Sequence, residues 1–157
     1  MYKVVFLIVL LGMALFPKPY GYFISALSFI LWRRIEWVAF RLRYLTTSLA
    51  TYITVFFLDL YLIGPPKWAP VWWEAVVLAP FAEELIFRAL PFAVLPPAAA
   101  WTFAVAVFGV LHFENPLIAT AYGLSLTLAY RGGGYLASFL LHSLNNAVWI
   151  LLATGGF

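Results

Sequence analysis

The chain has 157 residues, of which 66% are hydrophobic and 10% are charged, and its formal net charge is +3. Soluble domains are about 45–50% apolar and about 25% charged, so this composition excludes an ordinary soluble domain and indicates an integral membrane protein. The absence of cysteine excludes disulfides, thiolate catalysis and iron–sulfur ligation. The basic residues lie mostly at the ends of apolar runs, which is typical of membrane helices and does not suggest nucleic-acid binding.

Long continuous apolar runs predict membrane-spanning helices, each of which needs roughly 17–25 apolar residues. The runs are separated by prolines, glycines or paired arginines, which favour turns. In chain order the predicted helices are Val4–Phe16, Tyr20–Trp32, Tyr44–Ile63, Val71–Leu90, Ala98–Leu111, Leu117–Tyr130 and Tyr135–Leu152. We therefore predict an all-α, polytopic transmembrane helical bundle of about seven helices, in a multi-pass protein of the cell membrane.

Two adjacent carboxylates, Glu83 and Glu84, lie inside the apolar segment Val71–Leu90. A charged side chain at the centre of a membrane helix is unfavourable by roughly 2.5–3.5 kcal/mol on insertion scales, so such residues are usually paired or functional. Glu84 precedes Arg88 by four positions, on the same helix face, and we predict an ion pair between them. Glu83 is turned about 100° away from that pair, and we predict that it is the functional carboxylate.

Three further polar residues, His112, His142 and Asn146, also lie in or at the ends of apolar segments. His142 and Asn146 are four positions apart and therefore share a helix face, and Phe108 precedes His112 by the same spacing. We expect these residues to converge with Glu83 from three helices. A carboxylate and an imidazole can activate a water molecule, and histidine and asparagine donors can stabilise an oxyanion. The pattern therefore predicts a hydrolytic site.

A divalent metal is an alternative for the same residues, because Glu83, His112 and His142 resemble the ligands of zinc peptidases. No His-Glu-x-x-His sequence places two ligands on one helix, however, and asparagine is a poor zinc ligand. We prefer a mechanism that requires no cofactor, with zinc as the alternative. Serine-protease chemistry is disfavoured, since no serine lies in a Gly-x-Ser-x-Gly sequence and no aspartate accompanies the histidines.

Taken together, the polar residues form three ordered motifs: Glu83-Glu84-x-x-x-Arg88, Phe108-x-x-x-His112 and His142-x-x-x-Asn146. Their order, spacing and apolar context resemble the CAAX prenyl protease and bacteriocin-processing (CPBP) family of intramembrane proteases. The resemblance covers roughly 71–152. One departure is Ala89, which stands where the family usually has glycine.

This resemblance implies a four-helix catalytic core at 71–152. Residues 1–70 carry no motif of the family, and their apolar runs predict transmembrane or interfacial helices before the core, with a short tail at 153–157 after it. It implies that Glu83 and His112 activate the water and that His142 and Asn146 form the oxyanion hole. Glu84, Arg88 and Phe108 would support the site. The implied activity is an intramembrane endopeptidase acting beside the bilayer on a peptide or lipidated-protein substrate, including CAAX-type prenylated proteins.

The membrane orientation is left open by two conflicting arguments. The arginines at 33, 34, 41 and 43 favour a cytoplasmic loop, and counting helices from there places the loop at 113–116 outside. His112 lies at that end, so the site should open there, whereas prenyl-protein processing occurs on the cytosolic side.

Two other functions remain as alternatives. A non-catalytic membrane scaffold or immunity protein would keep the fold, although it would not need all three motifs intact. A proton-coupled transporter would use Glu83 and Glu84 as a relay, but the small size and the lack of a repeated half disfavour it.

Overall fold

The computed structural model describes residues 2–67 and 70–155, and within them all regular structure is helical. The N-terminal hairpin consists of α1 (Tyr2–Leu15) and of α2 (Tyr20–Ile24), which continues into a 3₁₀ helix at Ser25–Arg34. It is followed by α3 (Leu42–Leu62). The central helix comprises a π-type segment (Glu74–Leu78), α4 (Ala79–Glu84), a second π-type segment (Leu85–Ala89) and α5 (Leu90–Val94). The helix after it comprises α6 (Pro97–Thr102), a π-type segment (Phe103–Val107) and α7 (Phe108–Leu111). The last is α8 (Pro116–Ala153). The all-helical prediction is confirmed.

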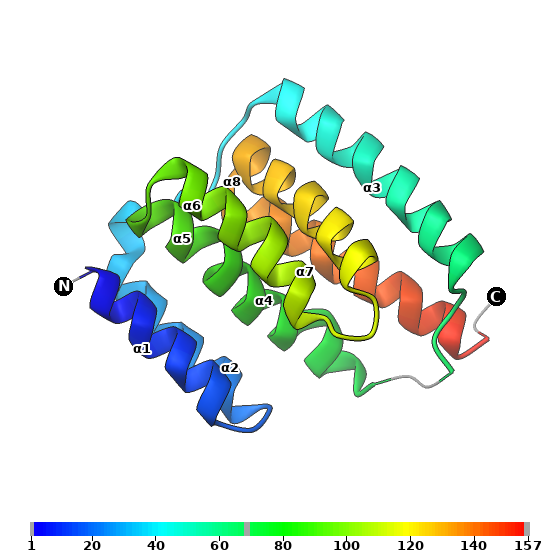
Figure 1. The fold of residues 1–157 in the computed structure, drawn as a ribbon, viewed down its shortest axis with the longest axis horizontal. Helices are drawn as coiled ribbons and strands as arrows, with labels where there is room; N and C mark the ends of the chain where they lie inside the picture. Colours follow the sequence, from blue (N-terminus) through cyan, green and yellow to red (C-terminus); the bar gives the residue numbers. More distant parts are fainter. Residues whose placement is uncertain (1, 68–69, 156–157) are drawn as a thin grey trace.

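The predicted count of about seven helices is not confirmed, because the described residues form six helical stretches. The two C-terminal predictions belong to one element, α8, which reverses its direction at Gly134 (Figure 1). Gly134 has φ 76° and ψ −168°, a backbone conformation that is essentially restricted to glycine. Of the described helices, α3 and α8 are long and apolar enough to cross a membrane.

The reversal of α8 is held by the loop that precedes α3. The second half of α8 begins with free backbone N–H groups, as every helix does. Tyr135 donates its N–H to the carbonyl oxygen of Glu36 at 2.8 Å, and Leu136 donates to that of Trp37 at 3.0 Å. In the other direction, Arg41 donates its N–H to the carbonyl of Gly132 at 2.7 Å. The loop at 35–41 and the turn at Gly134 therefore lie at the same end of the bundle.

Two wide π-type turns interrupt the central helix, at Glu74–Leu78 and at Leu85–Ala89. Each contains the residue four positions before a proline, Pro80 or Pro91. A proline ring clashes with the carbonyl of the residue four positions earlier and cannot donate to it, and a wider turn relieves that clash. The prolines thus explain why this helix, although continuous from 72 to 94, is not a regular α-helix.

The central helix lies between the N-terminal hairpin and α8 (Figure 1), and its residues 84–91 are buried. On the hairpin side it contributes to an apolar cluster that joins α1 to α5 and α7, with members Val5, Phe6, Val9, Leu31, Ile86, Phe87, Leu90, Phe108 and Leu126. On the far side of α8, helix α3 packs along its length. Ser48 and Ser125 join these two helices by donating to each other's carbonyl oxygens at 2.8 and 3.0 Å. Such small polar contacts allow close helix packing in membranes.

Candidate active site

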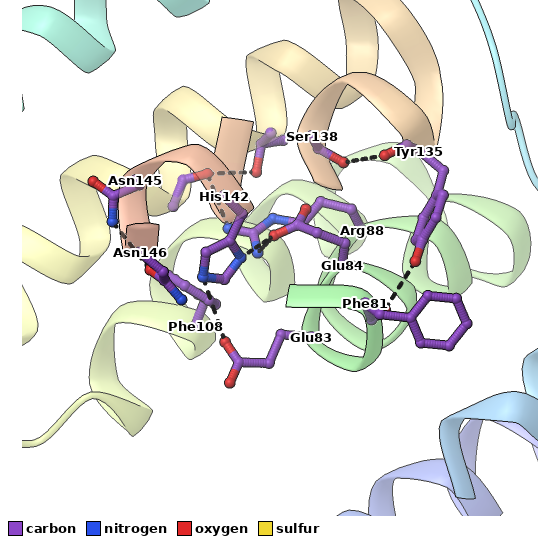
Figure 2. Close-up of polar contacts among 12 residues, drawn as sticks. Phe81, Glu83, Glu84, Arg88, Phe108, Tyr135, Ser138, His142, Asn145 and Asn146 are labelled. Atoms are coloured by element: carbon purple, nitrogen blue, oxygen red, sulfur yellow. Dashed lines mark hydrogen bonds and ion pairs between the residues drawn. The ribbon is translucent and has the colours of Figure 1, made fainter. Parts of the chain in front are cut away.

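The structure brings Glu83, His112 and His142 together. Figure 2 shows Glu83 and His142, which face each other from two helices. Glu83 lies on α4, His112 directly follows α7, and His142 lies in the second half of α8. Oε2 of Glu83 is 4.0 Å from Nε2 of His112 and 3.9 Å from Nε2 of His142. These separations are longer than direct hydrogen bonds. A water molecule beside the three groups can bridge separations of this length by hydrogen bonding.

The other ring nitrogen of each histidine is committed to an acceptor. Nδ1 of His142 lies 2.8 Å from Oε1 of Glu84, and Nδ1 of His112 lies 2.7 Å from the carbonyl oxygen of Phe108. A carbonyl and an ion-paired carboxylate only accept, so Nδ1 must carry the proton in both rings. In a neutral ring Nε2 then has a free lone pair. Both free lone pairs are on the nitrogens nearest Glu83.

Glu84 and Arg88 form the predicted ion pair, which is confirmed with a distance of 2.9 Å between Arg88 Nη1 and Glu84 Oε1. Both side chains are 0% exposed. Arg88 also donates to the carbonyl of Gly123 at 3.4 Å, and its guanidinium lies 4.1 Å from the centre of the Phe108 ring. Because one oxygen of Glu84 accepts from both Arg88 and His142, the ion pair fixes the position of the His142 ring.

Among the described residues, Asn146 forms no hydrogen bond with the carboxylates of Glu83 or Glu84. Its amide Nδ2 donates to the carbonyl of Ala75 at 2.8 Å, and its Oδ1 accepts from Nδ2 of Asn145 at 3.3 Å. One N–H of the Asn146 amide is left over. This residue lines a cavity of about 120 Å³ together with Tyr52, Phe108, His112, Ala119, Tyr122, Leu126, His142 and Asn145. The side chains of Asn146 and His142 therefore line the same cavity.

Phe108 forms one wall of the site. Its ring centroid is 4.3 Å from that of His112 and 6.2 Å from that of His142, at an interplanar angle of 82° to the latter. The same residue supplies the carbonyl that accepts from His112. Phe108 thus orients both histidines, one by packing and hydrogen bonding and the other by packing.

The three motifs therefore meet at one place, and a family comparison agrees with them. The model of the family described as "Type II CAAX prenyl endopeptidase Rce1-like" matches residues 65–148, which is more than half of the chain. The chain belongs to this family. No curated protein and no solved structure matches it.

Membership of the Rce1-like family places the chain among membrane-embedded proteins of the CAAX prenyl protease class. The match covers all the motif residues, from Glu83 to Asn146, and begins after α3. The predicted resemblance is therefore confirmed at the level of the family.

Two residues of this Rce1-like site were not predicted from the sequence. Asn145 orients the Asn146 amide, and its own Oδ1 is buried with no hydrogen-bond partner among the described residues. The hydroxyl of Tyr122 is also buried without a hydrogen-bond partner among the described residues, and both side chains line the cavity with His112 and His142. Asn145 is adjacent to a motif residue, which was the one available signal. Tyr122 has no comparable signal, since tyrosines are common in this chain.

The donor set of this Rce1-like protein fits a metal ion poorly. Two ligands of one tetrahedral zinc ion lie roughly 3.3 Å apart when each bond is about 2.0–2.1 Å. The Glu83 carboxylate is 3.9–4.0 Å from both histidine nitrogens. Across residues 2–67 and 70–155, no group of three His, Asp or Glu side chains is arranged to hold a metal.

Proposed function

We propose that this Rce1-like protein is an intramembrane endopeptidase that uses water as the nucleophile and Glu83 as the general base. The observation that supports this most strongly is the convergence of the Glu83 carboxylate with the Nε2 atoms of His112 and His142. A water between them has two hydrogens to donate, and all three facing atoms are acceptors. The polarity of the site therefore matches the role of activating water rather than binding an anion in the resting state.

In the proposed first step Glu83, assisted by His112, removes a proton from this water as its oxygen attacks the scissile carbonyl carbon. The carbonyl π electrons move to oxygen and form an oxyanion. The second N–H of Asn146 then donates to it, and Nε2 of His142 also donates after it has taken up a proton from solvent, which returns to solvent when the products leave. In the second step the proton held by Glu83 passes to the amide nitrogen, the C–N bond breaks, and a new carboxyl terminus and a new amino terminus leave.

His142 can donate from Nε2 only when its ring carries both protons, because Nδ1 already donates to Glu84. The Glu84 carboxylate, which accepts from Nδ1 of His142, stabilises that imidazolium, as the carboxylate of a catalytic triad does. Glu84 and Arg88 are thus positioning residues, and Phe108 shapes the wall of the site. We propose that 71–152 forms the catalytic unit, whose core consists of the central helix, the α6–α7 helix and the two halves of α8, and that 1–70 packs against it.

The proposed substrate is a peptide bond close to the membrane surface in the cell membrane. A CAAX-type prenylated peptide is the first probe, because the family description names that class and a site in detergent is accessible from either face. The experiment compares two quenched fluorogenic peptides of one sequence, prenylated and unmodified, with the purified protein in detergent. Mass spectrometry of the products locates the cleaved bond. Cleavage of either peptide at one bond, lost in Glu83→Ala, supports the proposal, and a lack of cleavage of a broad peptide set contradicts it.

A further inference from the structure

The charged residues are sorted between the two ends of the helical bundle. Successive helices run in alternate directions, so the loops at 35–41 and 95–96 and the turn at Gly134 share one end, while 16–19, 63–67 and 112–115 share the other (Figure 1). The first end carries one acidic residue, Glu36, and six basic residues: Lys3, Arg33, Arg34, Arg41, Arg43 and Arg131. The second end carries two basic residues, Lys18 and Lys67, and three acidic residues, Asp59, Glu74 and Glu114.

Direct contacts tie the basic end together. The guanidinium of Arg34 lies 3.8 Å from the centre of the Tyr2 ring, which brings the start of α1 beside the end of the hairpin. Arg41 donates to the carbonyl of Arg131 at 2.7 Å and pairs with Glu36, whose carboxylate raises the pKa of Arg41 above its ordinary value. The loop at 35–41 therefore packs on the turn of α8 and does not re-enter the bundle.

The candidate active site opens at the opposite end. His112 is 42% exposed there, and two surface clefts adjoin it. One cleft, of about 390 Å³, is lined by Asp59, His112, Glu114 and Tyr122 among others. The second, of about 490 Å³, shares Asp59, Glu114 and Tyr122 and extends to Asn145. Both clefts lead from the acidic end towards the cavity that His112 and Asn145 line.

We propose that the active site opens on the non-cytoplasmic face of the membrane and acts on polypeptide segments that have already crossed it. Lys and Arg in short loops orient membrane proteins with their basic loops in the cytoplasm, and Asp and Glu contribute little to that choice. One end of the bundle carries six basic residues and the other carries two, so we assign the first end to the cytoplasm. The N-terminal hairpin starts and finishes at the basic end, so the result does not depend on whether the hairpin spans the bilayer.

This inference deepens the proposed function and, for its substrate class, rests on it. A prenylated C-terminus displayed on the cytosolic surface would not reach a site with this orientation. The substrate class becomes a translocated peptide or the exported segment of a membrane-anchored protein. The orientation itself is a property of the folded chain and is measurable whether or not the protein is a protease.

The chain contains no cysteine, so single cysteines report orientation without background. The matched pair is Phe113→Cys at the site end and Val38→Cys at the basic end. Both positions lie in loops, are 80% and 71% exposed, and are uncharged, so the charge bias stays intact. Intact cells expressing each variant are treated with a membrane-impermeant maleimide, before and after permeabilisation.

The expected result is labelling of the Phe113→Cys variant in intact cells and labelling of the Val38→Cys variant only after permeabilisation. The reverse pattern, or equal labelling of both variants in intact cells, overturns the proposal. A second arm adds an impermeant fluorogenic peptide outside sealed right-side-out vesicles and expects cleavage without detergent. If the labelling is as expected but no peptide is cleaved even in detergent, the orientation stands and the proposed protease activity fails.

Discussion

Nδ1 of His142 lies 2.8 Å from Oε1 of Glu84, the same oxygen that pairs with Arg88 at 2.9 Å. Two adjacent glutamates thereby take different roles. Glu84 is fully buried and holds an arginine and a histidine in place, whereas Glu83 has no direct hydrogen bond to a described side chain and faces both imidazoles across a gap. Substitutions at the two glutamates should therefore differ in their effects on stability and on turnover.

Glu84→Ala and Arg88→Ala should each lower the midpoint of thermal unfolding more than Glu83→Ala does. Each of the first two substitutions leaves a buried, unpaired charge, which destabilises a protein by roughly 3–5 kcal/mol. Glu83→Ala breaks no ion pair of this kind. Melting curves of the three purified variants in one detergent provide the comparison. A lower midpoint for Glu83→Ala than for the other two would refute the division of roles.

Asn146→Ala should act on turnover rather than on substrate binding. Loss of one oxyanion donor lowers kcat by about 10²–10³-fold, with little change in KM. Asn145→Ala is the control. Because Asn145 acts on the proposed oxyanion only through Asn146, this substitution should lower kcat by less than Asn146→Ala does. Steady-state kinetics with one fluorogenic peptide measure both. A rise in KM with unchanged kcat in Asn146→Ala would instead assign this residue to substrate binding.

Exhaustive chelation should leave the activity unchanged, since the preferred mechanism uses no metal and the donor spacing suits zinc poorly. The measurement is the initial rate before and after chelator treatment and after readdition of zinc, with elemental analysis of the same preparation. Stoichiometric zinc that disappears in His112→Ala or His142→Ala, together with activity restored by zinc, would establish the metal alternative.

Gly134→Ala should destabilise the fold at the reversal of α8. A Cβ at this position would lie 2.7 Å from the Glu36 carbonyl oxygen, and its backbone conformation is unfavourable for other residues by roughly 1–3 kcal/mol. Gly64→Ala is the matched control, because Gly64 also has a positive φ, 79°, but a Cβ there would lie 4.0 Å from its nearest neighbouring atom. Thermal unfolding should show the larger loss for Gly134→Ala, and equal losses would contradict the clash.

The motif residues and the helical class could be predicted from the sequence because both depend on short-range patterns. Apolar runs predict helices, and a spacing of four positions predicts the pair between Glu84 and Arg88, which is confirmed. The break at Gly132-Gly133-Gly134 was also predicted as a turn, and the reversal occurs at Gly134.

The long-range hydrogen bonds could not be predicted, because they depend on how the helices pack. His142 contacts Glu84 across 58 positions, and Asn146 donates to Ala75 across 71. The bond to Glu84 fixes the tautomer of His142, and hence the protonation that its proposed role requires. The merging of the last two predicted helices into α8 likewise depends on the carbonyls of Glu36 and Trp37, which receive the N–H groups at the reversal.

The most direct test of the proposed mechanism is the turnover of Glu83→Gln beside Glu74→Gln, a glutamate on the same helix at the acidic end of the bundle. Glutamine keeps the size of the side chain but cannot accept the proton from water. Removal of a positioned base lowers the rate by typically 10²–10⁴-fold. We predict a loss of this size in Glu83→Gln, with unchanged thermal unfolding and near-normal turnover in Glu74→Gln. A Glu83→Gln rate within a few-fold of the unsubstituted protein would contradict the proposed role of Glu83 as the base.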